Sequence, residues 1–437
     1  MNQKLSDIIT RFARNIGANR AVLALSTARL GDAVGNSILF IVIPLYVAKL
    51  PAPWFPLAEP VRVGFLIALY GLVNSSLQPV MGGLSDRLGR RKPLILLGLA
   101  IMGFSTFAFV LASRFADLLI LRVLQGLGVA LSIPASMALM ASATQQQTRG
   151  GSMGTYSTMR MLGFTIGPLM GGFLFERFGF NAAFYAGAGF IVLGMVLVQL
   201  WVDEVRPAPA QGSPSPRRSF RVFDRSLLTA GIVGGGIATF IMASDFSMIS
   251  SLEVQFNTRL GQGALGFSVA FSALMVSRLL FQIPLGRLSD RIGRKPVIVG
   301  GLLLMAPATA LLGVVGTLTQ LTGLRLFQGL ASAAIAAPAF ALAADLATKG
   351  GEARQMSIIT SGFGFGIAIG PLMSGVLAVS SFELPFLVGG LLSLVGAWIV
   401  LRMVPETVRS AATHGFLASL VARMRGPVDA REEDGGR

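Results

Sequence analysis

Long apolar runs separated by short polar segments dominate the sequence. Crossing a bilayer core as a helix takes about 20 apolar residues, and twelve runs reach about this length. The alternating ten-residue segments typical of a membrane β-barrel do not occur. The pattern therefore predicts an all-α membrane protein. Its expected spans are 21–48, 61–83, 94–113, 117–142, 152–175, 181–202, 227–252, 262–286, 296–316, 319–344, 355–379 and 383–403.

A segment rich in Pro, Ser and Arg separates the sixth run from the seventh. It reads RPAPAQGSPSPRRSFR at residues 206–221, a composition typical of a linker. We therefore expect two bundles of six helices. The expected units are an N-terminal cytoplasmic segment 1–20, a first bundle 21–202, a cytoplasmic linker 203–226, a second bundle 227–404 and a cytoplasmic tail 405–437.

Composition and charge agree with this picture. Charged residues make up only 13% of the chain, too few to cover the surface of a soluble protein. The net charge of +16 would suggest nucleic acid in a soluble protein, but most Lys and Arg lie in loops on one side of the expected membrane. We therefore expect a multi-pass protein of the inner (plasma) membrane with both termini in the cytoplasm and no nucleic-acid partner. Because the chain has no Cys and one His, we expect no metal and no other cofactor.

A charged stretch occurs twice. GGLSDRLGRRKP at 82–93 matches GRLSDRIGRKPV at 286–297, and nearly the same offset aligns LRVLQGLG at 121–128 with LRLFQGLA at 324–331. The whole six-helix unit is therefore repeated in the same direction. Parallel repeats of this kind predict two bundles related by a pseudo-two-fold axis, a binding site between them, and alternating access by rocking.

These stretches resemble the major facilitator superfamily over essentially the whole chain. Residues 82–92 are similar to the family's signature between its second and third helices, and Arg122-x-x-Gln125-Gly126 is similar to its fourth-helix motif. The pattern Gly163-x-x-x-Gly167-Pro168-x-x-Gly171-Gly172 resembles the motif of the twelve-helix drug:proton antiporters. The resemblance implies a secondary active transporter rather than an enzyme.

The resemblance also implies a gating role for the charged stretches. Asp86 would bind the start of the eleventh span near Arg354–Ser357 and close the cytoplasmic side, although the stretch could instead be only a topology signal and a tight turn. Asp345 can meet Arg291 or Arg294 in the second half, whereas the first half has no acid at the corresponding place. The last motif's glycines could simply serve close helix packing. The expected gating residues are Gly82, Asp86, Arg87, Gly89, Arg90, Arg91, Asp290, Arg291, Arg294, Asp345, Gly163, Gly167 and Pro168.

Charged residues inside the expected spans each require a reason, because burying an ionised group in a membrane is costly. We predict that Asp32 and Arg122 pair or exchange partners, and that Asp245 pairs more weakly with Arg325. The expected proton-coupling residues are Asp32, Arg122 and Asp245, with Asp32 binding the coupled proton. Asp32 lies about 15 Å from the inner end of its span, at a depth similar to that of Arg122. The alternative for Asp32 is a permanent salt bridge that only holds helices together.

Arg160 and Arg278 lie about 12 Å deep in two spans expected to face each other across the bundle interface. Such a pair could clamp an anionic group, or could instead satisfy backbone carbonyls or Asp32. The residues expected to bind substrate are Arg160, Arg278, Arg325, Phe40, Tyr70, Tyr156, Phe240 and Phe246.

The sequence therefore favours a proton-coupled antiporter that exports small amphipathic compounds. Two alternatives stay open, namely an exporter or exchanger of organic anions or lipid-like molecules, and a proton-independent uniporter. The expected partners are a small-molecule substrate, protons and the lipid bilayer, with the protein acting as a monomer.

Overall fold

The computed structural model describes residues 19–144, 148–204, 229–346 and 352–407, with the side chains of 86, 149, 150, 352–355 and 357 left out. Every long regular element in these ranges is a helix. The helices are α2 (Arg20–Lys49), α3 (Glu59–Leu88), α4 (Lys92–Ala108), α5 (Phe115–Ser142), α6 (Arg149–Trp201), α7 (Ala230–Ser247), α8 (Glu253–Leu260), α9 (Ala264–Ile292), α10 (Arg294–Ala310), α11 (Leu318–Asp345), α12 (Glu352–Leu377) and α13 (Leu384–Met403). Short 3₁₀ turns follow three of them, at η1 (Phe109–Leu111), η3 (Met248–Leu252) and η4 (Leu311–Val314).

The helix α6 crosses the membrane twice. Eleven helical stretches of the described chain are long and apolar enough to span a bilayer, but α6 has 53 residues and leaves the helical conformation at Gly179, where φ is 82°. Before Gly179, α6 runs parallel to α2, because Gly163 approaches Ala33 and Gly171 approaches Ile38. After it the direction reverses, so that Gly187 approaches Gly35 and Gly194 approaches Ala28. The twelve predicted crossings are therefore present, with the fifth and sixth joined at Gly179.

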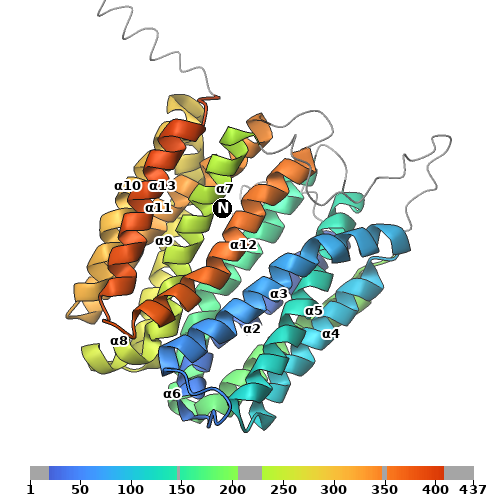
Figure 1. The fold of residues 1–437 in the computed structure, drawn as a ribbon. Helices are drawn as coiled ribbons and strands as arrows, with labels where there is room; N and C mark the ends of the chain where they lie inside the picture. The colour runs from blue at the N-terminus through green and yellow to red at the C-terminus, as the bar shows by residue number, and fades with distance from the viewer. Residues whose placement is uncertain (1–18, 145–147, 205–228, 347–351, 408–437) are drawn as a thin grey trace, which may run out of the picture.

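The helices form two bundles. Figure 1 shows α2–α5 on one side and α7–α13 on the other, and α6 completes the first bundle through its contact with α2. The second bundle repeats this contact, since Gly362, Gly366 and Gly370 of α12 pack against α7. Small residues allow the backbones of membrane helices to approach closely, which explains both packings.

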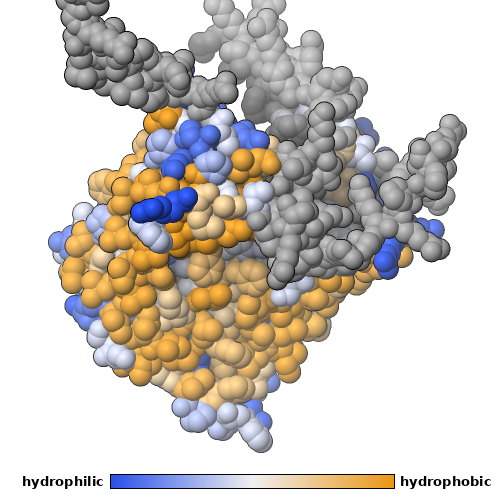
Figure 2. All heavy atoms as spheres, turned by 45° about the horizontal axis from the view of Figure 1, so that its top comes forward, coloured by the Kyte–Doolittle hydropathy of each residue, from blue (hydrophilic) through white to orange (hydrophobic). Residues whose placement is uncertain are grey.

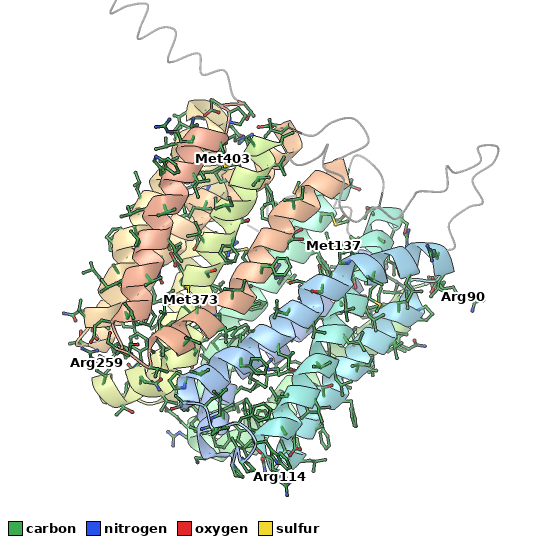
Figure 3. The ribbon with its side chains drawn as sticks, viewed as in Figure 1. Arg90, Arg114, Met137, Arg259, Met373 and Met403 are labelled. Carbon is green, nitrogen blue, oxygen red and sulfur yellow. The ribbon has the colours of Figure 1, made fainter. Side chains whose placement is uncertain are left out.

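The two ends of the molecule differ. We call the end that carries the charged stretches 82–93 and 286–297 the motif face, and the other end the opposite face. Figure 3 shows Arg90 at the motif face and Arg114 and Arg259 at the opposite face.

The bundles are joined at the opposite face and diverge toward the motif face (Figure 1). One hydrophobic core near the opposite face contains residues of both bundles, such as Ile38 and Phe271. Nearer the motif face each bundle has a core of its own. The structure therefore shows the two bundles sealed against each other at one end and separated at the other.

Small residues form the seal between the bundles. Gly64 of α3 approaches Pro371 of α12, and Gly172 of α6 approaches Ser268 of α9. Ser272 of α9 also donates a hydrogen bond to the carbonyl oxygen of Thr165 at 2.8 Å. These contacts lie in the halves of the helices that end at the opposite face.

Apolar side chains cover the sides of the molecule. Figure 2 shows a mostly hydrophobic described surface, with hydrophilic residues gathered near the two ends. Large exposed apolar side chains include Leu111, Leu200 and Trp398. Such a belt fits the hydrocarbon of a bilayer, where helices satisfy their own backbone hydrogen bonds.

Candidate functional site

Asp32 and Arg29 form a buried ion pair inside α2. They are three residues apart, so one helical turn brings them to the same face. Asp32 is 3% exposed and uses only Oδ2 in this pair, while Oδ1 has no hydrogen-bond partner among the described residues. The predicted direct pair of Asp32 with Arg122 is therefore absent from this structure, because Arg29 takes the place of Arg122, and an exchange of partners between the two stays a prediction.

Arg122 instead begins a chain of neutral partners in the first bundle. Its Nη1 donates to Gln125 Oε1 at 3.2 Å, and Gln125 Nε2 donates to Thr106 Oγ1 at 2.9 Å. The guanidinium also lies over the ring of Tyr70, whose hydroxyl accepts a hydrogen bond from Asn36 at 2.5 Å. This arrangement leaves Arg122 buried beside an aromatic ring without an acidic partner among the described residues.

The second bundle repeats the chain and ends it at an acid. Arg325 Nη1 donates to Gln328 Oε1 at 2.8 Å, and Gln328 Nε2 donates to Thr309 Oγ1 at 2.9 Å. Thr309 and Ser393 then donate to Asp245 Oδ2 at 3.3 and 2.6 Å. The predicted direct pair of Asp245 and Arg325 is therefore replaced by two intervening neutral side chains.

Asp245 has no acidic counterpart in the first bundle. Gly163 approaches Leu30 and Ala33, while its repeat partner Gly366 approaches Phe240 and Ala243. This match between α2 and α7 places Asp245 where the first bundle has Gly35. Asp32 and Asp245 therefore occupy different levels of their helices, and the second bundle also buries Glu253 at the start of α8.

Arg160 and Arg278 lie on opposite bundles and face one aromatic ring. Each guanidinium carbon is 5.7 Å from the ring centre of Phe363 on α12. Both side chains are half-buried, and neither forms a hydrogen bond or an ion pair with the described residues. The two arginines therefore lie near each other at the bundle interface, while their expected role as a clamp for an anion stays a prediction.

Most of the predicted aromatic residues lie beside these charges. Phe40 stacks on Phe271 across the bundle interface at 5.9 Å, and Phe246 lies 5.4 Å from the same ring. The guanidinium carbon of Arg29 lies over the ring of Tyr156, 5.7 Å from the ring centre. Phe240 differs, because it packs against the separate core of the second bundle.

The charged stretch of the second bundle is held by acids. Arg294 forms an ion pair with Asp290, donates to Asp345 Oδ2 at 3.1 Å and donates to Ser289 Oγ at 2.8 Å. The predicted contact of Asp345 with Arg294 is therefore confirmed, whereas Arg291 is exposed.

In the first bundle Ser142 stands at the position that Asp345 occupies in the second, and it contacts Arg91. Arg91 donates to the carbonyl oxygen of Ala138 at 2.7 Å and to Ser142 Oγ at 3.0 Å. Arg87 and Arg90 are exposed. The predicted contact of Asp86 with residues 354–357 lies outside the described side chains.

The glycines and the proline of the predicted gating set lie at a helix end, at helix contacts or inside a helix. Gly89 ends α3 with a positive φ of 59°. Gly163 and Gly167 lie where α6 packs against α2, and Pro168 follows them inside α6. Gly82 faces Pro134 on α5.

Two acids at the motif face were missed by the sequence analysis. Glu204 accepts hydrogen bonds from the backbone nitrogens of Arg91 and Lys92 at 2.8 and 3.1 Å. Glu406 does the same for Arg294 and Lys295 at 2.9 and 3.2 Å. A carboxylate is favoured at a helix N-terminus, which is where α4 and α10 begin. The sequence signal for these two acids is a Glu shortly after the sixth apolar run and another shortly after the twelfth.

Comparison with known proteins supports the fold and the class of the protein. Residues 25–252 and 235–427 match the Major Facilitator Superfamily. The chain belongs to this superfamily. It is 28% identical to the multidrug resistance protein MdtG of Serratia proteamaculans over 384 residues, covering 85% of this chain and 92% of that protein. It is 24% identical to the multi-drug resistance efflux pump PmrA of Streptococcus pneumoniae, covering 72% of this chain and 79% of that protein.

A solved structure agrees in fold. A bacterial homologue of the human lysosomal transporter Spinster, inward-facing and unoccupied, superposes with a TM-score of 0.70 at 16% identity, over 94% of this chain and 98% of that chain. The superfamily member described here is therefore a multi-pass membrane transporter of a small-molecule substrate, and it is not an enzyme.

Proposed function

We propose that the protein is a proton-coupled antiporter that exports small amphipathic compounds by alternating access. The observation that supports proton coupling is the ion pair of Asp32 and Arg29, which is buried in a helix of the first bundle. A buried acid in a membrane span is by default a functional group, and this one keeps an oxygen without a partner. The relatives MdtG and PmrA are named for multidrug resistance and efflux, which supports export of drug-like compounds.

Protonation of Asp32 would break its pair with Arg29. The released guanidinium of Arg29 would then lack its negative partner. Arg160 lies close enough for its positive charge to act on both Arg29 and Asp32, so it would repel the released guanidinium. Proton binding at one residue would therefore change the charge of the whole cluster. Rocking of the bundles about the seal at the opposite face would expose Asp32 to each side in turn.

We further propose that the motif face is cytoplasmic and that the protein lies in the inner (plasma) membrane. The charged stretches 82–93 and 286–297 carry eight Lys and Arg residues, whereas the segments expected on the other side of the membrane carry five, and loops rich in Lys and Arg stay on the cytoplasmic side. In this orientation the two bundles would diverge toward the cytoplasm.

Everted membrane vesicles test this function. Ciprofloxacin, a fluorescent amphipathic zwitterion, should accumulate in vesicles that contain the protein when the lumen is made acidic, and its entry should release luminal protons. Asp203→Asn, on an exposed acid, is the matched control for Asp32→Asn. Accumulation that ignores the imposed pH gradient would contradict proton coupling and would favour a uniporter.

A further inference from the structure

Arg160 and Arg278 lie near the buried pair of Arg29 and Asp32. Arg160 is within electrostatic range of Arg29, Arg278 and Asp32. Asp32 is already paired with Arg29. The guanidinium groups of Arg160 and Arg278 thus remain without an acidic partner among the residues that the structure describes. Unpaired charges in a membrane protein are costly, so this excess of positive charge requires a compensating group.

Arg160 and Arg278 sit where the two bundles begin to separate. Ser272 and Thr165 form the hydrogen bond that joins α9 to α6, and the two arginines follow five or six residues further toward the motif face. This distance corresponds to roughly 8–9 Å along each helix. The arginines therefore lie just beyond the seal, on the side where the bundles diverge toward the motif face.

Phe363 fixes the spacing of the two guanidinium groups. Each guanidinium carbon is 5.7 Å from the centre of this ring, so the two charges are at most twice that distance apart. Cations are attracted to aromatic faces, which offsets part of their mutual repulsion and holds them in one place. Arg160 also lies 5.6 Å from the ring of Phe164.

Apolar rings continue from this cluster toward the seal. Phe164 lies 6.0 Å from Phe40, and Phe40 lies 5.9 Å from Phe271 of the other bundle. A ligand that reaches the arginines therefore meets cations at one end and aromatic carbon at the other.

We infer that Arg160, Arg278 and Phe363 form a binding site for an organic acid. Its carboxylate would accept hydrogen bonds from both guanidinium groups, and its apolar body would lie against Phe40 and Phe164. This inference rests on the proposed transport function and specifies the charge of its substrate. Two arginines suit the two oxygens of a carboxylate, which accepts charge-assisted hydrogen bonds from both.

Calorimetric titration of the purified protein in detergent micelles tests the site without any gradient. The probes are 2-naphthoate and its neutral match 2-naphthamide. The intact protein should bind the acid at least about tenfold more tightly than the amide, the scale of one charged hydrogen bond. Arg160→Gln and Arg278→Gln should each weaken naphthoate binding about ten- to hundredfold and leave the amide nearly unchanged. Arg177→Gln, on an exposed arginine at the opposite face, is the matched control.

Asp32→Asn separates this inference from proton coupling. It removes the acid that competes for Arg29 and Arg160, so naphthoate binding should tighten even though coupled transport fails. If naphthoate binding depends on the two arginines but transport shows no proton coupling, the binding site is upheld and the proposed antiport function is rejected.

Three results would overturn the inference. The first is equal binding of acid and amide, and the second is an equal loss of both probes in the Arg160 and Arg278 variants. The third is displacement of naphthoate by phosphatidylglycerol in nanodiscs through the same two arginines, which would assign the site to a lipid headgroup.

Discussion

Arg29 pairs with Asp32 across one turn of α2, and the two residues are 9% and 3% exposed. Both members of this pair belong to the same helix. Rocking of the bundles alone therefore cannot pull them apart, as it could for a pair between helices. A change of protonation or a competing charge must separate them, which makes the pair a suitable link between proton binding and conformation.

The first prediction concerns the acid. Asp32→Asn keeps the shape of the side chain but cannot bind or release the coupled proton. Ciprofloxacin accumulation driven by a pH gradient should fall to the level of empty vesicles, while exchange of labelled for unlabelled ciprofloxacin should continue. Asp203→Asn should retain both activities. Driven accumulation at the normal rate in Asp32→Asn would move the coupling site elsewhere, with Asp245 as the next candidate.

The second prediction concerns the pairing itself. Removing one member of a buried ion pair costs about 3–5 kcal/mol, because the other charge is left uncompensated. Arg29→Gln should therefore lower the thermal unfolding midpoint in detergent, and adding Asp32→Asn to it should restore most of the loss. A double-mutant cycle gives the coupling energy directly. A coupling energy near zero would show that Arg29 and Asp32 do not pair in the native protein.

The third prediction concerns the two chains of neutral partners. Gln125→Leu and Gln328→Leu each leave a buried arginine and a threonine without their shared partner, at a cost of about 1–3 kcal/mol. Only Gln328 connects to an acid, through Thr309 to Asp245. Gln328→Leu should therefore alter the pH profile of transport, whereas Gln125→Leu should lower stability without changing that profile. Identical pH profiles for the two variants would exclude a role of this chain in proton transfer.

Much of the fold follows from the sequence, because each crossing is a long apolar run and the repeat is visible in the charged stretches. The join at Gly179 was not predicted, because continuity of a helix through a turn depends on a single backbone conformation. The pairing of Asp32 with Arg122 failed for a different reason. That prediction rests on the similar depths of Asp32 and Arg122 in their spans. The i, i+3 spacing of Arg29 and Asp32 on one helix indicates the observed pair more directly.

The interface site could be predicted only in part. Arg160 and Arg278 were expected to meet because the family fold places their spans opposite each other. Phe363, which both guanidinium groups face, gave no sequence signal, because the chain has 30 Phe residues and most serve packing. The hydrogen-bonded chains from Arg122 and Arg325 depend on side-chain rotamers of residues on different helices, which a single sequence does not specify.

The fourth prediction concerns pH at the opposite face. Arg259 donates to Glu383 at 2.8 Å, and this hydrogen bond together with a backbone one lowers the pKa of Glu383 below its ordinary value of 4.5. A lowered pKa means that the pair stabilises the fold above pH 4.5 and that this contribution is lost as the pH falls through the lowered value. Glu383→Gln should therefore unfold at a lower temperature than the intact protein at neutral pH and at nearly the same temperature in acid. A difference that persists in acid would show that the ion pair is not its source.

The last prediction concerns the seal between the bundles. A side chain at Gly64 would press against the backbone of Pro371 and Leu372 on α12, whereas a side chain at Gly154 would meet no atom within 4 Å. Overpacking of this kind costs about 1–3 kcal/mol, so Gly64→Leu should shift the population toward a state open at the opposite face by roughly five- to hundredfold. Ser272→Cys, introduced into this naturally Cys-free chain, reports the opening, because Ser272 is buried at the seal. A membrane-impermeant maleimide added from the opposite face should label this cysteine faster with Gly64→Leu than with Gly154→Leu. Equal labelling rates in the two backgrounds would mean that the contact of α3 with α12 does not close the opposite face.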